Sequence, residues 1–318
     1  MSTTSANTTL IPWHDCRSLS PQCPVASSTY GYAPSFGGNT YFIALFSACG
    51  ITQVSCGFRY KTWAYQLAMV LACIDQAIGY AGRLMLHNNA FDRSGFQIQI
   101  ICLVLGPAFN SAALYLVLKH IVLTFGPEAS KIRPDWYTWI FITGDLISLI
   151  IQALDGSFSA TAGGDRHRQD LAESFVIAGV SFQVVTLFFF AVATVWYAHR
   201  RRCTKYMVLS TEAQMFLKDS KFRMFIFGFV AAFVFIFIRC VFRIFEMAGG
   251  WRNEIMRNEV AFMVLDWCMI CVATVIQTVL HPGYCFPRLN SGYVVPTNSN
   301  HHVERNLAFE VSDATEPK

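Results

Sequence analysis

Seven long apolar runs constrain what this chain can fold into. Each run is close to the ~20 residues that an α-helix needs to cross the hydrocarbon core of a bilayer. The runs lie at residues 40–58, 63–86, 97–120, 136–154, 174–198, 223–247 and 259–280. The sequence therefore predicts an all-α integral membrane protein, built as a bundle of seven transmembrane helices.

The overall composition points the same way. Of the 318 residues, 54% are hydrophobic and 14% are charged, whereas soluble domains carry about 25% charged residues. The formal net charge of +4 is small and does not indicate a nucleic-acid partner. Residues 1–39 lack the apolar core of a signal peptide, so we expect the first transmembrane helix to direct insertion.

Lysine and arginine are distributed unequally between the two sets of loops. One set, together with the C-terminal tail, carries fifteen of the 24, the other carries six, and Arg83, Arg239 and Arg243 lie inside helices. Because cytoplasmic loops are enriched in these residues, we predict an outside N-terminus and a cytoplasmic C-terminus. The expected parts are an extracellular mobile arm at 1–38, a transmembrane domain at 39–282 and a disordered cytoplasmic tail at 283–318.

The N-terminal arm holds two candidate modification sites. Asn7-Thr8-Thr9 fits the N-glycosylation sequon, which matters only if the arm is outside. Cys16 and Cys23 lie in the same polar segment, where an extracellular location allows a disulfide but also two free thiols. Most other cysteines lie in apolar runs, where cysteine behaves as a small hydrophobe.

Polar residues inside six of the seven apolar runs recur at helical spacing, so that each of these six runs presents one polar stripe. Charges within a membrane span are costly and therefore indicate a functional site. We expect the stripes to converge on a charged, hydrated chamber nearer the outer leaflet. The alternative is structural, with buried ion pairs that only lock helices together. The stripes are Asp75, Gln76, Gly79 and Arg83; Gln99, Gly106 and Asn110; Asp145, Ser148 and Gln152; Gln183 and Thr194; Arg239, Arg243 and Glu246; and Glu259, Asp266 and Gln277.

Several kinds of chemistry find no support in the sequence. The eight histidines lie in tails, in loops or at helix ends, which argues against a zinc hydrolase inside the bundle. The last run has no lysine for a retinal Schiff base, and the chain has no glycine-rich phosphate loop. We therefore predict a protein that is not an enzyme and that binds no metal or cofactor.

Taken in order, several short motifs resemble the fungal lipid-translocating exporter family, the RTA-like, aminocholesterol-resistance-like seven-helix proteins. The motifs are Tyr30-Gly31-Tyr32-Ala33-Pro34-Ser35; Gly57 to Trp63; Ile78-Gly79-Tyr80 with Arg83; Gly106-Pro107-Ala108 with Tyr115; Gly144-Asp145 with Ser148 and Gln152; Arg239, Arg243 and Glu246; Glu259 with Asp266; and His281-Pro282-Gly283. The chain departs from that pattern after Gln152 and at Asp75, where glutamate is expected. The resemblance implies a plasma-membrane or vacuolar protein that is linked to release of sphingoid long-chain bases, to resistance against toxic amphiphiles and sterol analogues, and to porphyrin traffic.

Our first hypothesis is a membrane protein that translocates cationic amphiphiles. An ammonium head group would pair with a carboxylate while its chain stays in lipid, and the arginines would keep the carboxylates ionised or bind an anionic head group. The predicted substrate-binding residues are Asp75, Arg83, Asn110, Asp145, Gln152, Arg239, Arg243, Glu246, Glu259 and Asp266. The expected partners are membrane lipids and an amphiphilic small molecule.

Three alternatives stay open. Paired carboxylates can carry out acid–base catalysis, so an enzyme is one of them, although no nucleophile or metal constellation supports it. A seven-helix receptor or sensor would signal through a cytoplasmic partner bound at the basic loop 199–222. A proton-coupled carrier would use Asp145 or Asp266 to bind the proton.

Overall fold

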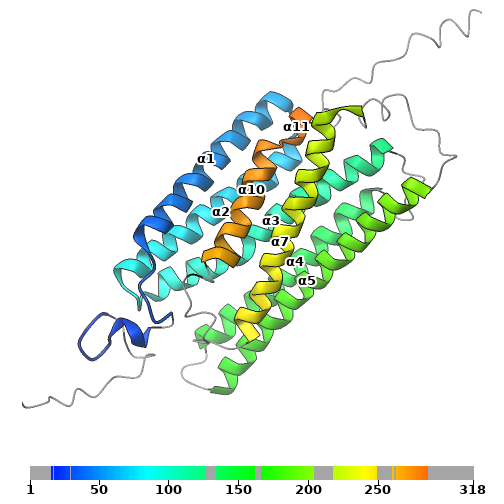
Figure 1. Cartoon of the computed structure of the whole chain (residues 1–318). Helices are drawn as coiled ribbons and strands as arrows, with labels where there is room; N and C mark the ends of the chain where they lie inside the picture. Colours follow the sequence, from blue (N-terminus) through cyan, green and yellow to red (C-terminus); the bar gives the residue numbers. More distant parts are fainter. Residues whose placement is uncertain are drawn as a thin grey trace, which may run out of the picture.

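The computed structural model describes residues 16, 18–28, 30–125, 134–161, 166–203, 218–248, 260 and 263–285. Within these residues the chain is helical and contains no strand (Figure 1). The elements are η1 (Val25–Ser27), α1 (Phe36–Tyr60), α2 (Trp63–Asn88), α3 (Arg93–Phe125), α4 (Pro134–Thr161), α5 (Arg166–Cys203), α7 (Ser220–Ala248), η3 (Met263–Cys268), α10 (Met269–Val279) and α11 (Pro282–Cys285).

The long helices have the length and composition of membrane spans. Six described helical segments are long and apolar enough to cross a bilayer, and α4 contains a shorter apolar helix, Thr138–Ala153. Large apolar side chains such as Ile51, Val195 and Phe227 are 68–76% exposed on the outside of the bundle, where lipid would cover them. The predicted all-α membrane bundle is thereby confirmed, and the protein is an integral membrane protein.

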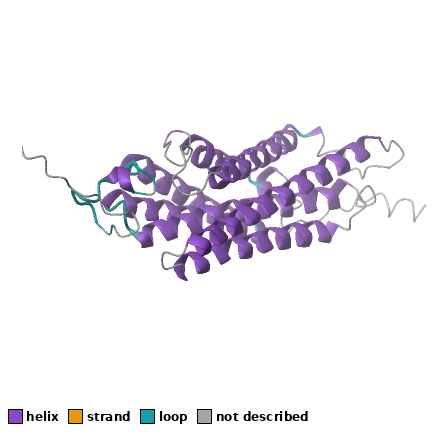
Figure 2. Ribbon diagram, turned by 90° about the horizontal axis from the view of Figure 1, so that it is seen from below, coloured by secondary structure: helices purple, strands orange, loops and turns teal. Residues whose placement is uncertain are grey.

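The helices run lengthwise in an elongated bundle (Figures 1 and 2). The most extensive contacts are those of α2 with α3, α4 with α5, and α1 with α2, while α10 packs on α7. Glycine allows the closest approach, since a Cβ on Gly82 of α2 would lie 2.9 Å from the Gly95 carbonyl oxygen of α3. Small residues bring membrane helices together in this way because no side chain separates the backbones.

Several helices extend beyond their predicted ends. Helix α1 begins at Phe36, inside the predicted arm, because Ser35 caps it and accepts a hydrogen bond from the Gly38 amide. Helix α1 ends where Lys61 adopts a left-handed conformation. At the other end of the chain, α11 runs from Pro282 into the predicted tail, and proline suits the first turn of a helix because its missing N–H would be unpaired there.

Several predicted features lie outside the described residues. They are Asn7, Glu259, most of the 199–222 loop and the tail beyond residue 285.

Candidate functional site

Two ion pairs lie inside the bundle, at the end that the charge distribution assigns to the outside. Arg239 of α7 contacts Asp266 of η3, with 2.8 Å between Nε and Oδ1. One turn further along α7, Arg243 pairs with Glu246 at 2.5 Å. All four residues are at most 2% exposed. The stripes predicted on these two helices therefore do face each other.

The element η3 is a π-helix, and it begins the last membrane span. It places the consecutive residues Asp266 and Trp267 in the interior, at 1% and 0% exposure. Wider π turns occur mostly as single-turn bulges within α-helices and are frequent at functional sites. The carboxylate that pairs with Arg239 thus sits on such a turn.

Arg83 of α2 is held by aromatic rings. Its guanidinium carbon lies 4.3 Å from the centroid of the Trp267 ring and 5.3 Å from that of Tyr30. Its Nη2 donates a hydrogen bond of 3.3 Å to the Tyr32 hydroxyl. A cation is attracted to the electron-rich face of such rings, more so where water is excluded, and Arg83 is fully buried.

Both tyrosines belong to a segment before α1, residues 30–34, which we call the tyrosine strap. The amide of Gln99 in α3 donates to the Tyr30 hydroxyl at 2.6 Å. Burial raises the pKa of Tyr30 to about 12, so the hydroxyl stays neutral and can act as both donor and acceptor. At the end of the strap, His87 Nδ1 lies 2.7 Å from the Pro34 carbonyl oxygen. The strap thus ties the described part of the arm to α2 and α3.

Further along the arm, the two cysteines whose state was left open by the sequence form a disulfide, Cys16–Cys23. The bond closes a short loop, with a sequence separation of 7 residues. Backbone hydrogen bonds between Ser20 and Cys23 lie inside that loop.

We call Arg83, Arg239, Arg243, Glu246 and Asp266 the outer charge cluster. Their exposed fractions are 0–2%, which differs from the hydrated chamber that we predicted. The reason is that the carboxylates pair with arginines, while aromatic rings occupy the space around Arg83. The described side chains of the cluster thus form a closely packed layer.

A second group of buried polar side chains, the inner polar layer, lies closer to the opposite end. Asn110 of α3 accepts hydrogen bonds from Thr274 and Gln277 of α10, at 3.3 and 3.4 Å. Gln53 of α1 donates to Thr278 at 3.1 Å. These five residues are at most 9% exposed, so α1, α3 and α10 meet through polar contacts in the interior.

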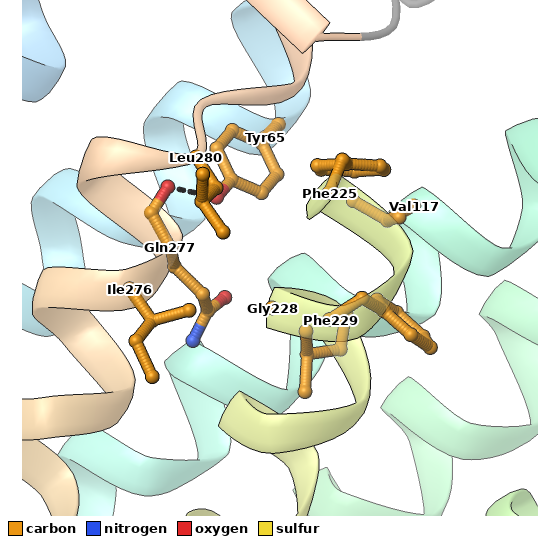
Figure 3. Close-up of a pocket in the computed structure, with 9 residues that line it drawn as sticks. Tyr65, Val117, Phe225, Gly228, Phe229, Ile276, Gln277 and Leu280 are labelled. Atoms are coloured by element: carbon orange, nitrogen blue, oxygen red, sulfur yellow. Dashed lines mark hydrogen bonds between the residues drawn. The ribbon is translucent and has the colours of Figure 1, made fainter. Parts of the chain in front are cut away.

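Figure 3 shows a small pocket beside this layer, between α7 and α10. The space that it offers to the centre of a water molecule is only about 10 Å³, so it is a narrow gap between side chains. Its lining is apolar apart from Tyr65 and Gln277, and the Tyr65 hydroxyl donates to the Gln277 carbonyl oxygen at 2.9 Å. The pocket is therefore separate from the outer charge cluster.

Asp145 of α4 occupies a third environment. The hydroxyls of Ser111 and Tyr115, both on α3, donate to its Oδ2 at 2.8 and 3.0 Å. Its Oδ1 is buried and has no hydrogen-bond partner among the described residues. The residue is 4% exposed, and no ion pair is formed there within the described part of the chain.

Two predicted site residues lie apart from these groups. Asp75 is only partly buried and interacts with the Cys102 side chain. Gln152 donates to the Ser148 carbonyl oxygen at 3.2 Å and packs against Gly179 of α5.

The structure thus brings together five of the ten predicted residues in the outer charge cluster and places Asn110, Asp145, Asp75 and Gln152 elsewhere. The sequence reasoning did not assign a role to Tyr30, Tyr32, Trp267, Ser111 or Tyr115. The sequence did contain a signal for Ser111 and Tyr115. They are four residues apart and therefore lie on the same side of a helix, next to Asn110.

Comparison with known proteins places this arrangement in a family. The family described as "RTA1 like protein" matches residues 69–289. The sphingoid long-chain base transporter RSB1 of Saccharomyces cerevisiae strain S288c is 25% identical, over 93% of this chain and 87% of that protein. The lipid-translocating exporter-like protein RTA1 of Leptosphaeria maculans is 25% identical, over 88% of this chain and 56% of that protein.

Protein RTM1 of Saccharomyces cerevisiae is 24% identical, over 71% of this chain and 72% of that protein. No solved structure matches the chain. The family match covers more than half of the sequence and confirms the resemblance seen in the motifs, so the chain belongs to the RTA1-like protein family.

Proposed function

We propose that this protein translocates amphiphilic lipids across the membrane and thereby confers resistance to toxic amphiphiles. Its cargo would be single-chain cationic amphiphiles of the sphingoid-base type. The names of its relatives describe sphingoid-base transport and lipid translocation, not catalysis, which supports a protein without enzymatic activity.

The observation that carries the proposal is the depth of the polar interior. Buried polar side chains occur at successive levels, from the outer charge cluster through the inner polar layer to His281, which is 2% exposed at the opposite end of α10. A head group that crosses the bilayer needs polar contacts at every depth, because bare polar groups are costly in hydrocarbon. Its chain can stay among the exposed apolar side chains of the helices.

The receptor is the alternative to translocation, and the comparisons do not favour it. The relatives' names describe transport. The receptor hypothesis can be tested directly. It predicts that a cytoplasmic partner co-purifies with the protein and that this co-purification is lost when loop 199–222 is exchanged.

The test of translocation uses a yeast strain deleted for its own members of this family. The strain expresses the chain, and release of a labelled sphingoid base and growth on added sphingoid base are measured. We expect Asp266→Asn and Glu246→Gln to lower both at normal surface expression. Asp219→Asn, which alters an exposed carboxylate before α7, is the control. Unchanged release and growth in both variants would overturn the proposal.

The cellular placement is part of the proposal. We expect the plasma membrane rather than the vacuole, with the arm outside. A fluorescent fusion shows which membrane contains the protein. An outside arm predicts a glycosidase-sensitive mobility shift that is lost in Asn7→Gln.

A further inference from the structure

Asp145 differs from the other buried carboxylates of the bundle in how its charge is balanced. Asp266 and Glu246 each contact an arginine, at 2.8 and 2.5 Å. Asp145 receives two hydroxyl hydrogen bonds on Oδ2, and its Oδ1 has no hydrogen-bond partner among the described residues.

The described residues of the helices around Asp145 supply no cation to it. On α3 the facing groups are the neutral hydroxyls of Ser111 and Tyr115. On α7 the Cys240 thiol, a neutral group, interacts electrostatically with Asp145. The neighbouring Arg239 is engaged by Asp266 and by the Leu103 carbonyl oxygen.

The remaining neighbours are also uncharged. On α5, Thr186 packs against Gly144 and donates to its own helix, at the Phe182 carbonyl oxygen. On α4 itself, the Ser148 hydroxyl donates to the backbone oxygen of Asp145.

An ionised carboxylate that is buried without a counter-charge is strongly disfavoured, and hydrogen bonds from hydroxyls offset only part of that cost. Asp145 therefore has to hold a cation in its resting state. The unpartnered Oδ1 is the atom that can accept one. A proton satisfies this requirement, and so does a primary ammonium group, but the two cannot occupy the same oxygen together.

Tyr115, whose hydroxyl donates to this carboxylate, belongs to a cluster of aromatic rings. The ring of Tyr115 lies 4.7 Å from that of Phe190 and 5.5 Å from that of Phe141, measured between centroids. An aromatic cluster this close to a carboxylate favours an ammonium ion, because ring faces attract a cation without competing for its hydrogen bonds.

We propose that Asp145 is a shared cation site, which binds either a proton or the ammonium head group of the cargo. The proposal rests on the proposed function, in that the cargo is a cationic amphiphile. The protonated carboxyl meets the ammonium ion, its proton leaves to the aqueous phase, and the carboxylate and ammonium form an ion pair. One proton is thus exchanged for one amine, and a proton gradient can drive export.

This exchange makes a quantitative prediction. When one proton is released for each amine bound, the apparent dissociation constant falls about tenfold for each pH unit of increase, over the range in which Asp145 is protonated. Without the carboxyl group the affinity should not depend on pH through this site.

The experiment uses the full chain in phosphatidylcholine nanodiscs, titrated with sphinganine. Isothermal titration calorimetry in two buffers of different ionisation enthalpy gives the affinity and the number of protons released, and empty nanodiscs provide the baseline. We expect about one proton per bound amine for the unchanged protein and for the control Asp219→Asn. Asp145→Asn should release none, and Asp145→Glu, which keeps a carboxyl group, should restore the release.

Three results would contradict the proposal in different ways. Amine binding without proton release by the unchanged protein would overturn the exchange and leave the proposed function standing. Proton release by Asp145→Asn equal to that of the unchanged protein would overturn the assignment of the site. Absence of sphinganine binding at every pH would overturn the cargo, and the exchange with it.

Discussion

The pair Arg239–Asp266 allows a decisive test of whether the outer charge cluster is dry. The change Asp266→Asn leaves the Arg239 guanidinium 2% exposed and without its carboxylate. Removing one partner of a buried ion pair costs about 3–5 kcal/mol. We expect Arg239→Gln to cost a similar amount, because it leaves the Asp266 carboxylate unpaired.

The double variant, Arg239→Gln with Asp266→Asn, should be much less destabilised than the sum of the two single variants. It replaces two charges by two amides that can bond to each other, so no buried charge is left uncompensated. The coupling free energy of the cycle should then be about 2 kcal/mol or more, whereas a solvated pair gives at most about 1 kcal/mol.

The assay is unfolding of the purified proteins by dodecyl sulfate, followed by circular dichroism, for the four members of the cycle. The control cycle combines Asp266→Asn with Asp219→Asn, which shares no contact with it and should be additive within about 0.5 kcal/mol. If the effects of Arg239→Gln and Asp266→Asn are additive, water is not excluded from this ion pair. That result would restore the hydrated chamber that the sequence predicted.

Three further predictions concern the strap, the disulfide and the helix contacts. Tyr30→Phe removes one hydrogen bond and should cost about 1 kcal/mol in the same unfolding assay, and no change would mean that the strap does not pack in solution. Cys16→Ala should leave Cys23 reactive toward a membrane-impermeant maleimide on intact cells, while the unchanged protein stays unlabelled; absence of labelling would contradict an outside arm. Gly82→Val should abolish monodisperse protein in size-exclusion chromatography, since even a Cβ would lie 2.9 Å from the Gly95 carbonyl oxygen.

The helices and their inward faces could be predicted because both depend on local sequence. An apolar run sets the length of a span, and the spacing of Arg239, Arg243 and Glu246 puts them on one side of a helix whatever that helix contacts. The inward direction follows from the cost of polar groups in lipid. These arguments predicted that the stripes of α7 and of the last span would meet, and they do.

The partners within the interior could not be predicted, because they depend on how the helices are aligned with one another. The π turn that carries Asp266 and Trp267 has no signature in a hydropathy pattern. The position of Tyr30 over Arg83 requires the segment before α1 to fold back over α2 and α3. The hydrated chamber was predicted from the number of charged residues inside the helices. That number does not show that arginine side chains and aromatic rings occupy the space between the helices.

The structure therefore shows that carboxylates which looked equivalent in the sequence have different surroundings. Asp266 and Glu246 are neutralised by arginines that are covalently part of the bundle, so their counter-charges cannot leave without moving a helix. Among the described residues, Asp145 is contacted by two hydroxyl groups and by no arginine or lysine, as the proposed exchangeable cation requires. Buried ion pairs are not required to hold helices together, because well-packed uncharged groups often do so equally well, so the arginine pairs alone do not indicate transport. The hydroxyl-supported carboxylate is instead the arrangement that the proposed exchange of a proton for an amine requires.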